Sequence, residues 1–435
     1  MDDSQAGMTP GTQSPYPQQP GGQIPAPPTG PVLPPTGDSV PAGRSKWSRQ
    51  SVILLWLSVV AVVVLLIVLY LIGDLDQFMQ IGILFLPLAV LAALAYVGRN
   101  NIVGAVFAYV ALAIVGLGVI VYSLANLLFG YVVDWQKFSA ILAGQSLAGA
   151  DLTGIFAPAA GPGLLWALLL YMLSALVAAA MLLRPVRKLV SRIMPIDPDN
   201  FVHKIALSIL TLLLLTSFIP LIVLGGEPPL LNIVNNPSLE SSLGGQSIAP
   251  QPLDLVYQFI WTIPATFVVA GWPIARRFPN MLKRLGLVRP TLQQVGFGVG
   301  FGVLLAVAAM FVIDPGIHWI WQSLGWQTTD TAAFEKLLGN LVTPVGAVLI
   351  GITAGLGEEL AVRGLLQPRI GLIASNLVFT GFHASQYGVD ALLSVFIIGL
   401  ILGVVRARSN TTTSAIVHGV YDFVLVLTSA LLAGQ

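Results

Sequence analysis

The sequence predicts an all-α fold: a polytopic membrane protein built as a bundle of about eleven transmembrane helices. Of its 435 residues, 56% are hydrophobic and 9% are charged, whereas a soluble domain carries about 25% charged residues. Apolar runs recur from residue 51 to the end of the chain, and a spanning helix needs about 20 such residues. The basic residues gather in alternate segments between these runs, as the positive-inside rule expects.

Composition also excludes several classes of protein. The 20 basic and 19 acidic residues leave a net charge of +1, so no strongly basic face is present to bind nucleic acid. The chain has no cysteine, which excludes disulfide bonds, a thiolate nucleophile and cysteine-ligated metal centres. Residues 1–48 are rich in Pro, Gly and Gln and cannot bury enough apolar area to offset their ordering entropy. We expect a disordered cytoplasmic tail there.

Two of the predicted spans carry signals of close packing. Glycines alternate from 296 to 302 in the seventh span, which lets a neighbouring helix approach closely. Pro344, Gly351, Gly355 and Gly357 predict that the eighth span is bent or partly buried. The predicted spans are 51–73, 79–98, 102–126, 162–183, 205–225, 255–275, 293–313, 342–362, 371–388, 391–405 and 412–432.

Charge placement sets the expected orientation. With the N-terminus in the cytoplasm and the C-terminus outside, all basic residues except Lys137 and Lys336 fall in cytoplasmic segments. We divide the membrane part into 49–254, an extension of unknown role, and 255–435, a second domain that carries the chemistry.

Ionisable side chains inside apolar spans cost about 2.5–3.5 kcal/mol each on insertion scales and usually mark function. They are scarce before residue 342 and gather after it. Glu359 and Arg363 are four residues apart and share a helix face, as do His418 and Asp422. The gathered residues are Glu358, Glu359, Arg363, His383, His418 and Asp422.

Each of these features also has a structural interpretation. A glutamate–arginine pair can be a clamp or can take part in catalysis, and both interpretations stay open for Glu359 and Arg363. Glu358 is rotated about 100° from Glu359 and does not share that arginine easily. A single buried histidine is more often hydrogen-bonded than catalytic. The joint occurrence of these ionisable residues on three helices that are close in sequence nevertheless predicts one shared polar site.

Three segments resemble the motifs of the CAAX-protease and bacteriocin-processing family (CPBP, also called Abi). EELAVRG (358–364) resembles the EExxxRG signature of that family. FTGFH (379–383) is similar to its FxxxH motif, and HGVYD (418–422) lies where its HxxxN motif belongs. Order and spacing agree, and the resemblance covers about residues 342–432.

This resemblance implies an intramembrane endopeptidase that cleaves a membrane-associated protein or peptide. The family positions that activate the attacking water fall on Glu358 and His383, and those that stabilise the oxyanion fall on His418 and Asp422. The supporting positions are Glu359, Arg363 and Phe379.

Two residues depart from the family pattern. Val362 stands where Phe is frequent, which is a change in packing. Asp422 replaces Asn, and an ionised carboxylate accepts hydrogen bonds but donates none. It can therefore orient His418, but it repels an oxyanion unless it is protonated.

We expect no metal cofactor, and the alternative is zinc held by Glu358, Glu359, His383 and His418. The expected location is the cytoplasmic membrane of a prokaryote, in contact with lipid and without a nucleic-acid partner, and the oligomeric state is not predicted. The rival hypothesis is a non-catalytic membrane protein, a transporter or scaffold, that retains the polar cluster. Eleven spans exceed what the protease core needs, so the first six leave room for such a role.

Overall fold

The computed structural model describes residues 49–128, 160–235 and 249–434, and every regular element within these ranges is a helix. The predicted all-α fold is therefore confirmed for this part of the chain. The predicted tail, residues 1–48, lies outside the described residues, as do parts of the two long predicted outer loops.

Eight helices within the described residues are long and apolar enough to cross a membrane, or nine if a bent pair counts as one span. That pair is α2 (Leu75–Gly82) and α3 (Leu86–Gly98), bent by 52°. The predicted number of eleven is not confirmed. One difference lies between Pro344 and Phe382, where a single 39-residue helical stretch replaces two predicted spans. This stretch is interrupted at Gly371, whose φ of 82° is left-handed.

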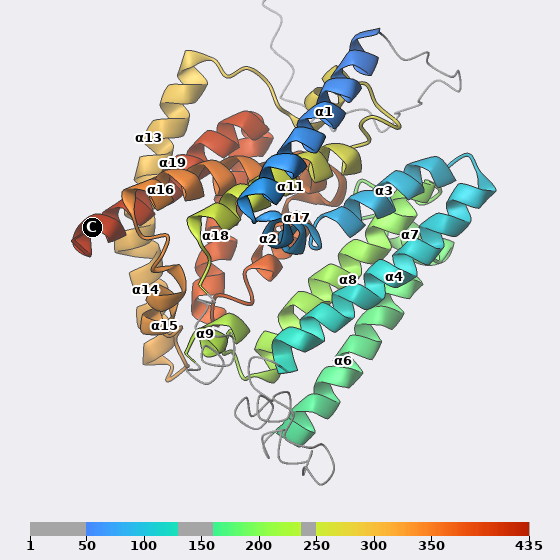
Figure 1. Ribbon diagram of the computed structural model, residues 1–435. Coiled ribbons are helices and arrows are strands. Elements are labelled where there is room, and N and C mark those ends of the chain that lie inside the picture. Colours follow the sequence, from blue (N-terminus) through green and yellow to red (C-terminus); the bar gives the residue numbers. More distant parts are fainter. Residues whose placement is uncertain (1–48, 129–159, 236–248, 435) are drawn as a thin grey trace, which may run out of the picture. The chain divides into compact units, whose positions relative to one another are not determined.

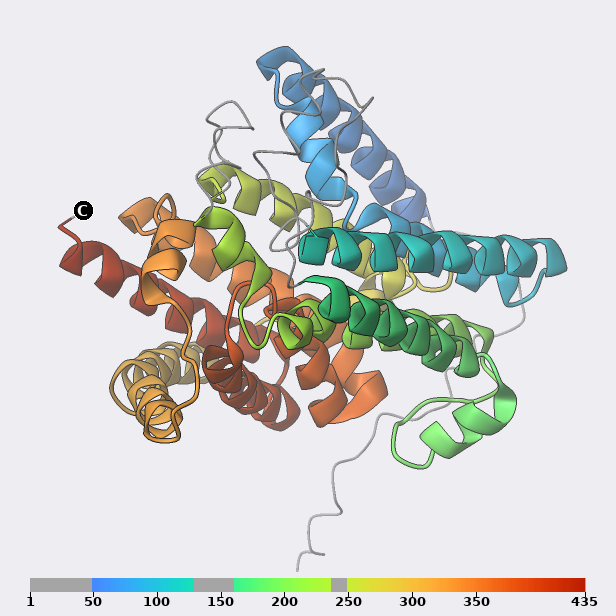
Figure 2. The same ribbon diagram turned by 90° about the horizontal axis from the view of Figure 1, so that it is seen from below.

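The first half of the described chain forms a group of long helices. The remaining bounds are α1 (Arg49–Ile72), α4 (Ile102–Leu127), α6 (Ala160–Ala180), α7 (Arg184–Val190), α8 (Phe201–Val223) and α9 (Pro229–Val234). Asn101 and Asn200 cap α4 and α8, because their side chains accept hydrogen bonds from backbone N–H groups of the first turn. Helix α8 packs against α3, α4 and α6, and Figures 1 and 2 show α4, α6 and α8 side by side.

The exposed surface of helix α4 indicates whether this group of helices lies in water or in lipid. Its face towards the bundle is built from Gly104, Ala108, Leu112 and Gly116, which are buried. The opposite face exposes a long apolar stripe, made of Val103, Val106, Val110, Ile114, Leu117 and Val121. Contiguous apolar surface of this kind is unfavourable in water, so the helix fits a lipid environment. The protein is a multi-pass integral membrane protein.

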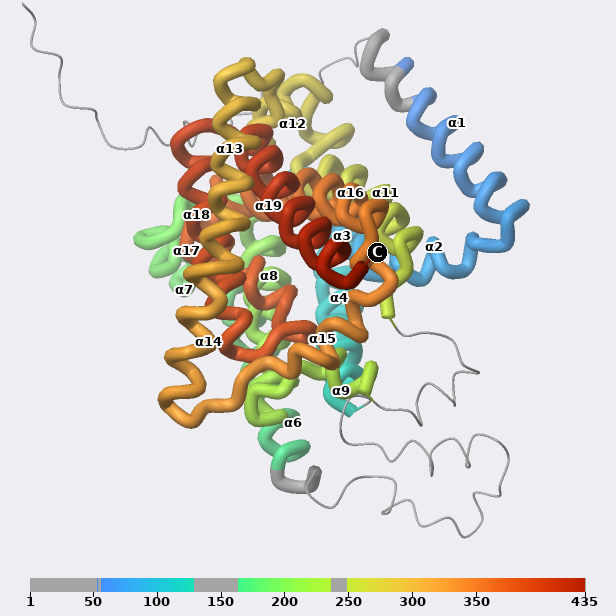
Figure 3. Tube along the Cα trace, turned by 90° about the vertical axis from the view of Figure 1, so that its left-hand side faces the viewer, coloured from blue at the N-terminus to red at the C-terminus, as the bar shows by residue number. Residues whose placement is uncertain are grey.

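The second half contains the polar residues. Its α-helices are α11 (Pro252–Val269), α12 (Phe278–Leu285), α13 (Leu292–Ala308), α14 (Asp314–Ser323), α15 (Thr331–Leu338), α16 (Pro344–Ile352), α17 (Gln367–Phe382), α18 (Val389–Arg408) and α19 (Thr411–Leu432). Its π-helical segments are η3 (Ala309–Ile313), η4 (Thr353–Glu358) and η5 (Leu360–Leu366). Figure 3 shows α13 continuing through η3 into α14, with α19 lying beside α13.

The alternating glycines of α13 explain its contact with α19. A Cβ at Gly302 would lie 2.7 Å from the carbonyl oxygen of Val417, and one at Gly298 would lie 2.6 Å from Ile416. Gly296 and Gly300 face open space. The predicted close approach of a neighbouring helix is therefore confirmed for one of the two glycine faces.

Basic residues from several segments meet at one end of this half, here called the basic end. Arg284 donates hydrogen bonds to the carbonyl oxygens of Gly364 and Leu365, at 3.1 and 3.2 Å. Burial, followed by the positive charges around it, lowers the pKa of Arg284 to about 9. The basic neighbours that act on it are Arg276, Arg369 and Arg406. Three segments predicted to lie on one side of the membrane thus share one end of the structure.

Candidate active site

The site is built where two helices touch through glycine. A Cβ at Gly355 would lie 2.6 Å from the Cα atom of Gly419, and one at Gly351 would lie 2.7 Å from the carbonyl oxygen of Gly419. Only glycine permits this approach of η4 to α19. The contact places the glutamates at the end of η4 beside the polar face of α19.

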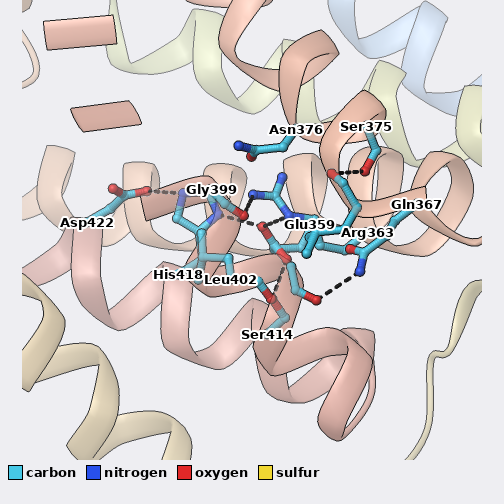
Figure 4. Close-up of polar contacts among 12 residues, drawn as sticks. Glu359, Arg363, Gln367, Ser375, Asn376, Gly399, Leu402, Ser414, His418 and Asp422 are labelled. Atoms are coloured by element: carbon cyan, nitrogen blue, oxygen red, sulfur yellow. Dashed lines mark hydrogen bonds and ion pairs between the residues drawn. The ribbon is translucent and has the colours of Figure 1, made fainter. Parts of the chain in front are cut away.

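Glu359 is the centre of the buried polar network (Figure 4). Its side chain is fully buried, and Oε1 lies 3.1 Å from Nδ1 of His418 and 3.5 Å from Nε of Arg363. Oε2 accepts a hydrogen bond of 2.5 Å from the hydroxyl of Ser414. Both carboxylate oxygens are therefore occupied, as a buried charge requires.

Arg363 is held from three sides. Besides Glu359, its Nη2 donates to the carbonyl oxygen of Gly399 at 2.9 Å. The guanidinium also lies over the ring of Phe379, 4.4 Å from its centroid, where a cation–π attraction stabilises it. The predicted Glu359–Arg363 pair is thus present, and Phe379 supports the arginine as well as the histidine one turn away.

His418 lies between two carboxylates. Its Nδ1 faces Glu359, and its Nε2 lies 3.3 Å from Oδ2 of Asp422. Only 4% of His418 is exposed. The predicted pairing of His418 with Asp422 along the helix is present, and Glu359 adds a second partner from another helix.

His383 has a defined tautomer. Its Nδ1 lies 2.9 Å from the carbonyl oxygen of Phe379. A carbonyl oxygen can only accept, so Nδ1 carries the proton and Nε2 of the neutral ring keeps its lone pair. The rings of His383 and Phe379 are 4.8 Å apart, and that of Phe379 is 6.1 Å from His418. Phe379 therefore lies within ring contact of both histidines.

Glu358 differs from its neighbour Glu359 in its surroundings. It is half-buried and, within the described residues, makes no hydrogen bond or ion pair. It acts electrostatically on His418, Asp422 and Arg363, which places it beside the network rather than inside it. The carboxylate has free lone pairs next to the two residues of the third motif.

Several residues of the network escaped the sequence analysis. Gln367 donates to the carbonyl oxygen of Gly403 at 2.8 Å, one turn beyond the bond from Arg363 to Gly399. A Cβ at Gly399 would lie 2.0 Å from Oδ1 of Asn376. Two glycines four residues apart in α18 were the available signal, since this spacing favours helix contact. Ser414 was also overlooked. It lies one turn before His418 and shares the face of that histidine, and this spacing was the available signal.

The residues of the zinc alternative do not fit a metal site as they are arranged. Within the described ranges, no three His, Asp or Glu side chains are placed to hold a metal ion together. Glu359 and His418 bind each other, and Glu359 also faces Arg363. A zinc site needs free donor atoms that converge on one point.

The fold and the site define a helical membrane protein with a buried Glu–His–Arg cluster. Residues 340–424 match the model of a protein family described as type II CAAX prenyl endopeptidase, Rce1-like, and this region contains all three motifs. This match, over about a fifth of the chain, is consistent with the CAAX-protease (CPBP) family and supports an intramembrane protease. Comparison with curated proteins and with solved structures gives no match.

Proposed function

We propose that the protein is an intramembrane endopeptidase in which Glu358 activates a water molecule for attack on a peptide bond. The observation that carries the proposal is the contrast between the two adjacent glutamates. Glu359 is fully engaged in the network, whereas Glu358 keeps free lone pairs beside it. A general base needs a free lone pair within reach of the water proton.

In the proposed reaction, the carboxylate of Glu358 takes one proton from water, and the oxygen attacks the scissile carbonyl carbon. Nε2 of His383 accepts the other water proton in a hydrogen bond and orients the attack. Both ring nitrogens of His418 face carboxylates, so His418 supports the developing oxyanion through the electrostatics of this network rather than through a free N–H of its own. The C–N bond then breaks, and the proton on Glu358 passes to the leaving amine. No step requires a metal.

The proposed substrate is a membrane-associated protein or peptide. The matched family is described by its action on CAAX prenyl proteins, and a lipid-embedded site supports a substrate that is itself held at the membrane. We also propose that the N-terminus and the basic end face the cytoplasm, in the cytoplasmic membrane of a prokaryote. The domain boundary near residue 255 remains a prediction.

The decisive experiment compares Glu358→Gln with wild type by profiling new peptide termini in membranes of cells that express each form. The amide keeps the side-chain volume but cannot accept the proton, so the termini produced by wild type should disappear. Glu335→Gln, on an exposed position of α15, is the matched control and should cleave normally. Glu359→Gln should instead lower the yield of folded protein, since it leaves a buried arginine without its charge partner.

Wild-type cleavage by a folded Glu358→Gln protein would refute the assignment of the base. The absence of any new termini that depend on expression of the wild-type protein would instead favour the rival hypothesis of a transporter or scaffold.

A further inference from the structure

His383 lies at the end of a helix rather than in its middle. It is the C-cap residue of α17, and the turn 384–388 separates it from α18. Within this turn, the N–H groups of Gln386 and Tyr387 both donate to the carbonyl oxygen of His383, at 3.0 and 3.1 Å. Helix ends fray more easily than helix centres. The direction of the His383 ring therefore depends on what holds this turn from outside.

Thr329, in the loop between α14 and α15, holds the far end of the turn. Its backbone N–H donates to both carboxylate oxygens of Asp390, at 3.1 and 3.0 Å, and its hydroxyl donates to Oδ1 at 2.5 Å. The same hydroxyl accepts a hydrogen bond of 3.0 Å from the backbone N–H of Gly388. Gly388 is the N-cap of α18, and Asp390 lies in its first turn. One threonine thus bonds to the turn and to the helix that follows it.

The contact between Thr329 and Asp390 is close and buried. Asp390 is 6% exposed, and a buried carboxylate needs hydrogen-bond donors to offset its lost hydration. Thr329 supplies them from its backbone and from its side chain. A Cβ at Gly388 would lie 2.6 Å from Oγ1 of Thr329, so glycine is what permits this approach.

Aromatic rings continue the same support to the imidazole. The ring of Tyr387 lies 5.8 Å from that of His383 and 4.9 Å from that of Phe334. Phe334 belongs to α15, which begins two residues after Thr329. The hydrogen bonds to the turn and the ring contact beside His383 therefore come from one short segment of the chain.

Helices α8 and α9 support the same turn from the first half of the chain. The N–H of Leu230 in α9 donates to the carbonyl oxygen of Ser385 at 2.9 Å. Ala384, which is 1% exposed, packs in one cluster with Leu221 of α8. Helix α9 also packs against α15 (Figure 3). The region predicted as an extension of unknown role, 49–254, thus contributes to the surroundings of His383.

We propose that Thr329 and Asp390 are positioning residues for His383. Their contact fixes the turn after α17, so that the ring keeps Nδ1 bonded to the carbonyl oxygen of Phe379 and directs Nε2 towards the attacking water. The role in catalysis rests on the proposed function, whereas the fixed tautomer of the ring does not. Both residues act through the turn, where a displacement of about 1 Å is enough to misplace a reacting group.

The tautomer of His383 tests the proposal without any substrate. The full chain is labelled with ¹³C-histidine in lipid nanodiscs, and NMR is recorded at a pH where the ring is neutral. The chain has four histidines, and a His383→Gln sample assigns the signal. The ¹³Cδ2 shift distinguishes the two neutral tautomers, which the hydrogen bond at Nδ1 selects. Wild type should show the Nδ1–H tautomer alone.

Substitutions at Thr329 separate the hydroxyl from the shape of the side chain. Thr329→Val keeps the shape but removes the hydroxyl, so His383 should show a mixture of both tautomers. Thr329→Ser keeps the hydroxyl and should show the single tautomer of wild type. Thr328→Val makes the same change one residue earlier, outside the contact with Asp390, and is the matched control.

Cleavage of a peptide that wild type cuts is the second measurement. Thr329→Val should lower kcat at least about ten-fold and change KM less than about two-fold, because a misplaced His383 affects the attack rather than substrate binding. Thr329→Ser and Thr328→Val should cleave as wild type does.

Asp390→Asn decides the outcome if Thr329→Val does not fold, since its amide oxygen cannot accept all the hydrogen bonds that the carboxylate accepts. A folded protein with either substitution in which His383 keeps a single tautomer would overturn the proposal. If wild type cleaves no peptide, the proposed reaction fails, but the tautomer still decides whether Thr329 and Asp390 position His383.

Discussion

At the scale of single residues, two adjacent glutamates have different surroundings because one helical step separates their directions. Glu359 points into the protein, where His418, Arg363 and Ser414 compensate its charge. Glu358 points beside this network and is half-buried. The first arrangement suits a residue that positions others, and the second suits one that exchanges a proton.

Asp422 gives the prediction that belongs to this scale. Asp422→Asn should keep the fold and retain at least about a tenth of the wild-type cleavage rate, because the amide can still hydrogen-bond to Nε2 of His418. The matched family uses Asn at this position, according to the sequence resemblance. Asp422→Ala should lower the rate further, since it removes the partner of Nε2. Initial rates and thermal unfolding of the two purified variants test this. A folded Asp422→Asn protein without activity would show that the carboxylate itself takes part in the chemistry.

At the scale of elements, glycine contacts set the positions of the helices that carry the site. Gly355 of η4 meets Gly419 of α19, and Gly399 of α18 leaves room for Asn376 of α17. In a membrane, helix association depends on close packing because lipid is as apolar as the side chains. Loss of one of these glycine contacts would shift a helix, and the side chains of the site on that helix would then be displaced from their hydrogen-bond partners.

Gly302 and Gly300 provide a matched pair on α13. Gly302→Ala should lower the stability by about 1–3 kcal/mol, the usual cost of overpacking, because the new Cβ would meet the backbone of Val417. Gly300→Ala meets open space and should leave the stability unchanged or raise it by up to about 1 kcal/mol. Thermal unfolding in detergent measures both. Equal effects of the two substitutions would contradict the assigned contact.

At the scale of the whole molecule, the placement of charge predicts one orientation across the membrane. The arginines around Arg284 gather at one end, and the exposed acidic residue Glu335 belongs to α15, outside the candidate spans. By the positive-inside rule, we expect the basic end to face the cytoplasm. This orientation follows from where the chain places its charge, and it can be measured directly.

Single cysteines at Arg289 and Glu335 test the orientation, because both positions are exposed and the chain has no other thiol. A membrane-impermeant maleimide added to intact cells should label Glu335→Cys but not Arg289→Cys, and permeabilised cells should label both. Labelling of Arg289→Cys in intact cells would reverse the proposed orientation.

The metal content is a second property of the whole protein. We expect the purified protein to contain much less than one equivalent of zinc and to keep its cleavage activity in a chelator, because Glu359 and His418 are occupied by each other and by Arg363. Native mass spectrometry and elemental analysis measure the content. Stoichiometric zinc, with activity lost on chelation and restored by the metal, would contradict the metal-free reaction.

The sequence by itself determined the membrane class, the helical fold and the segments that hold the polar residues. These properties depend on local composition and on periodicity: an apolar run of sufficient length forms a helix in lipid because its backbone groups have no other partners. Residues four apart, such as Glu359 and Arg363 or His418 and Asp422, are paired by the helix itself.

Only the tertiary structure decided which residues meet across helices. The contacts of Glu359 with Ser414 and His418, and of Arg363 with Gly399, join segments 36 to 59 residues apart. The number of spans also depended on it, because the helical stretch from Pro344 to Phe382 continues where the sequence predicted two separate spans. Such contacts arise from the crossing of helices at glycines, and the partner of a glycine face is chosen by packing of the whole bundle rather than by any local pattern.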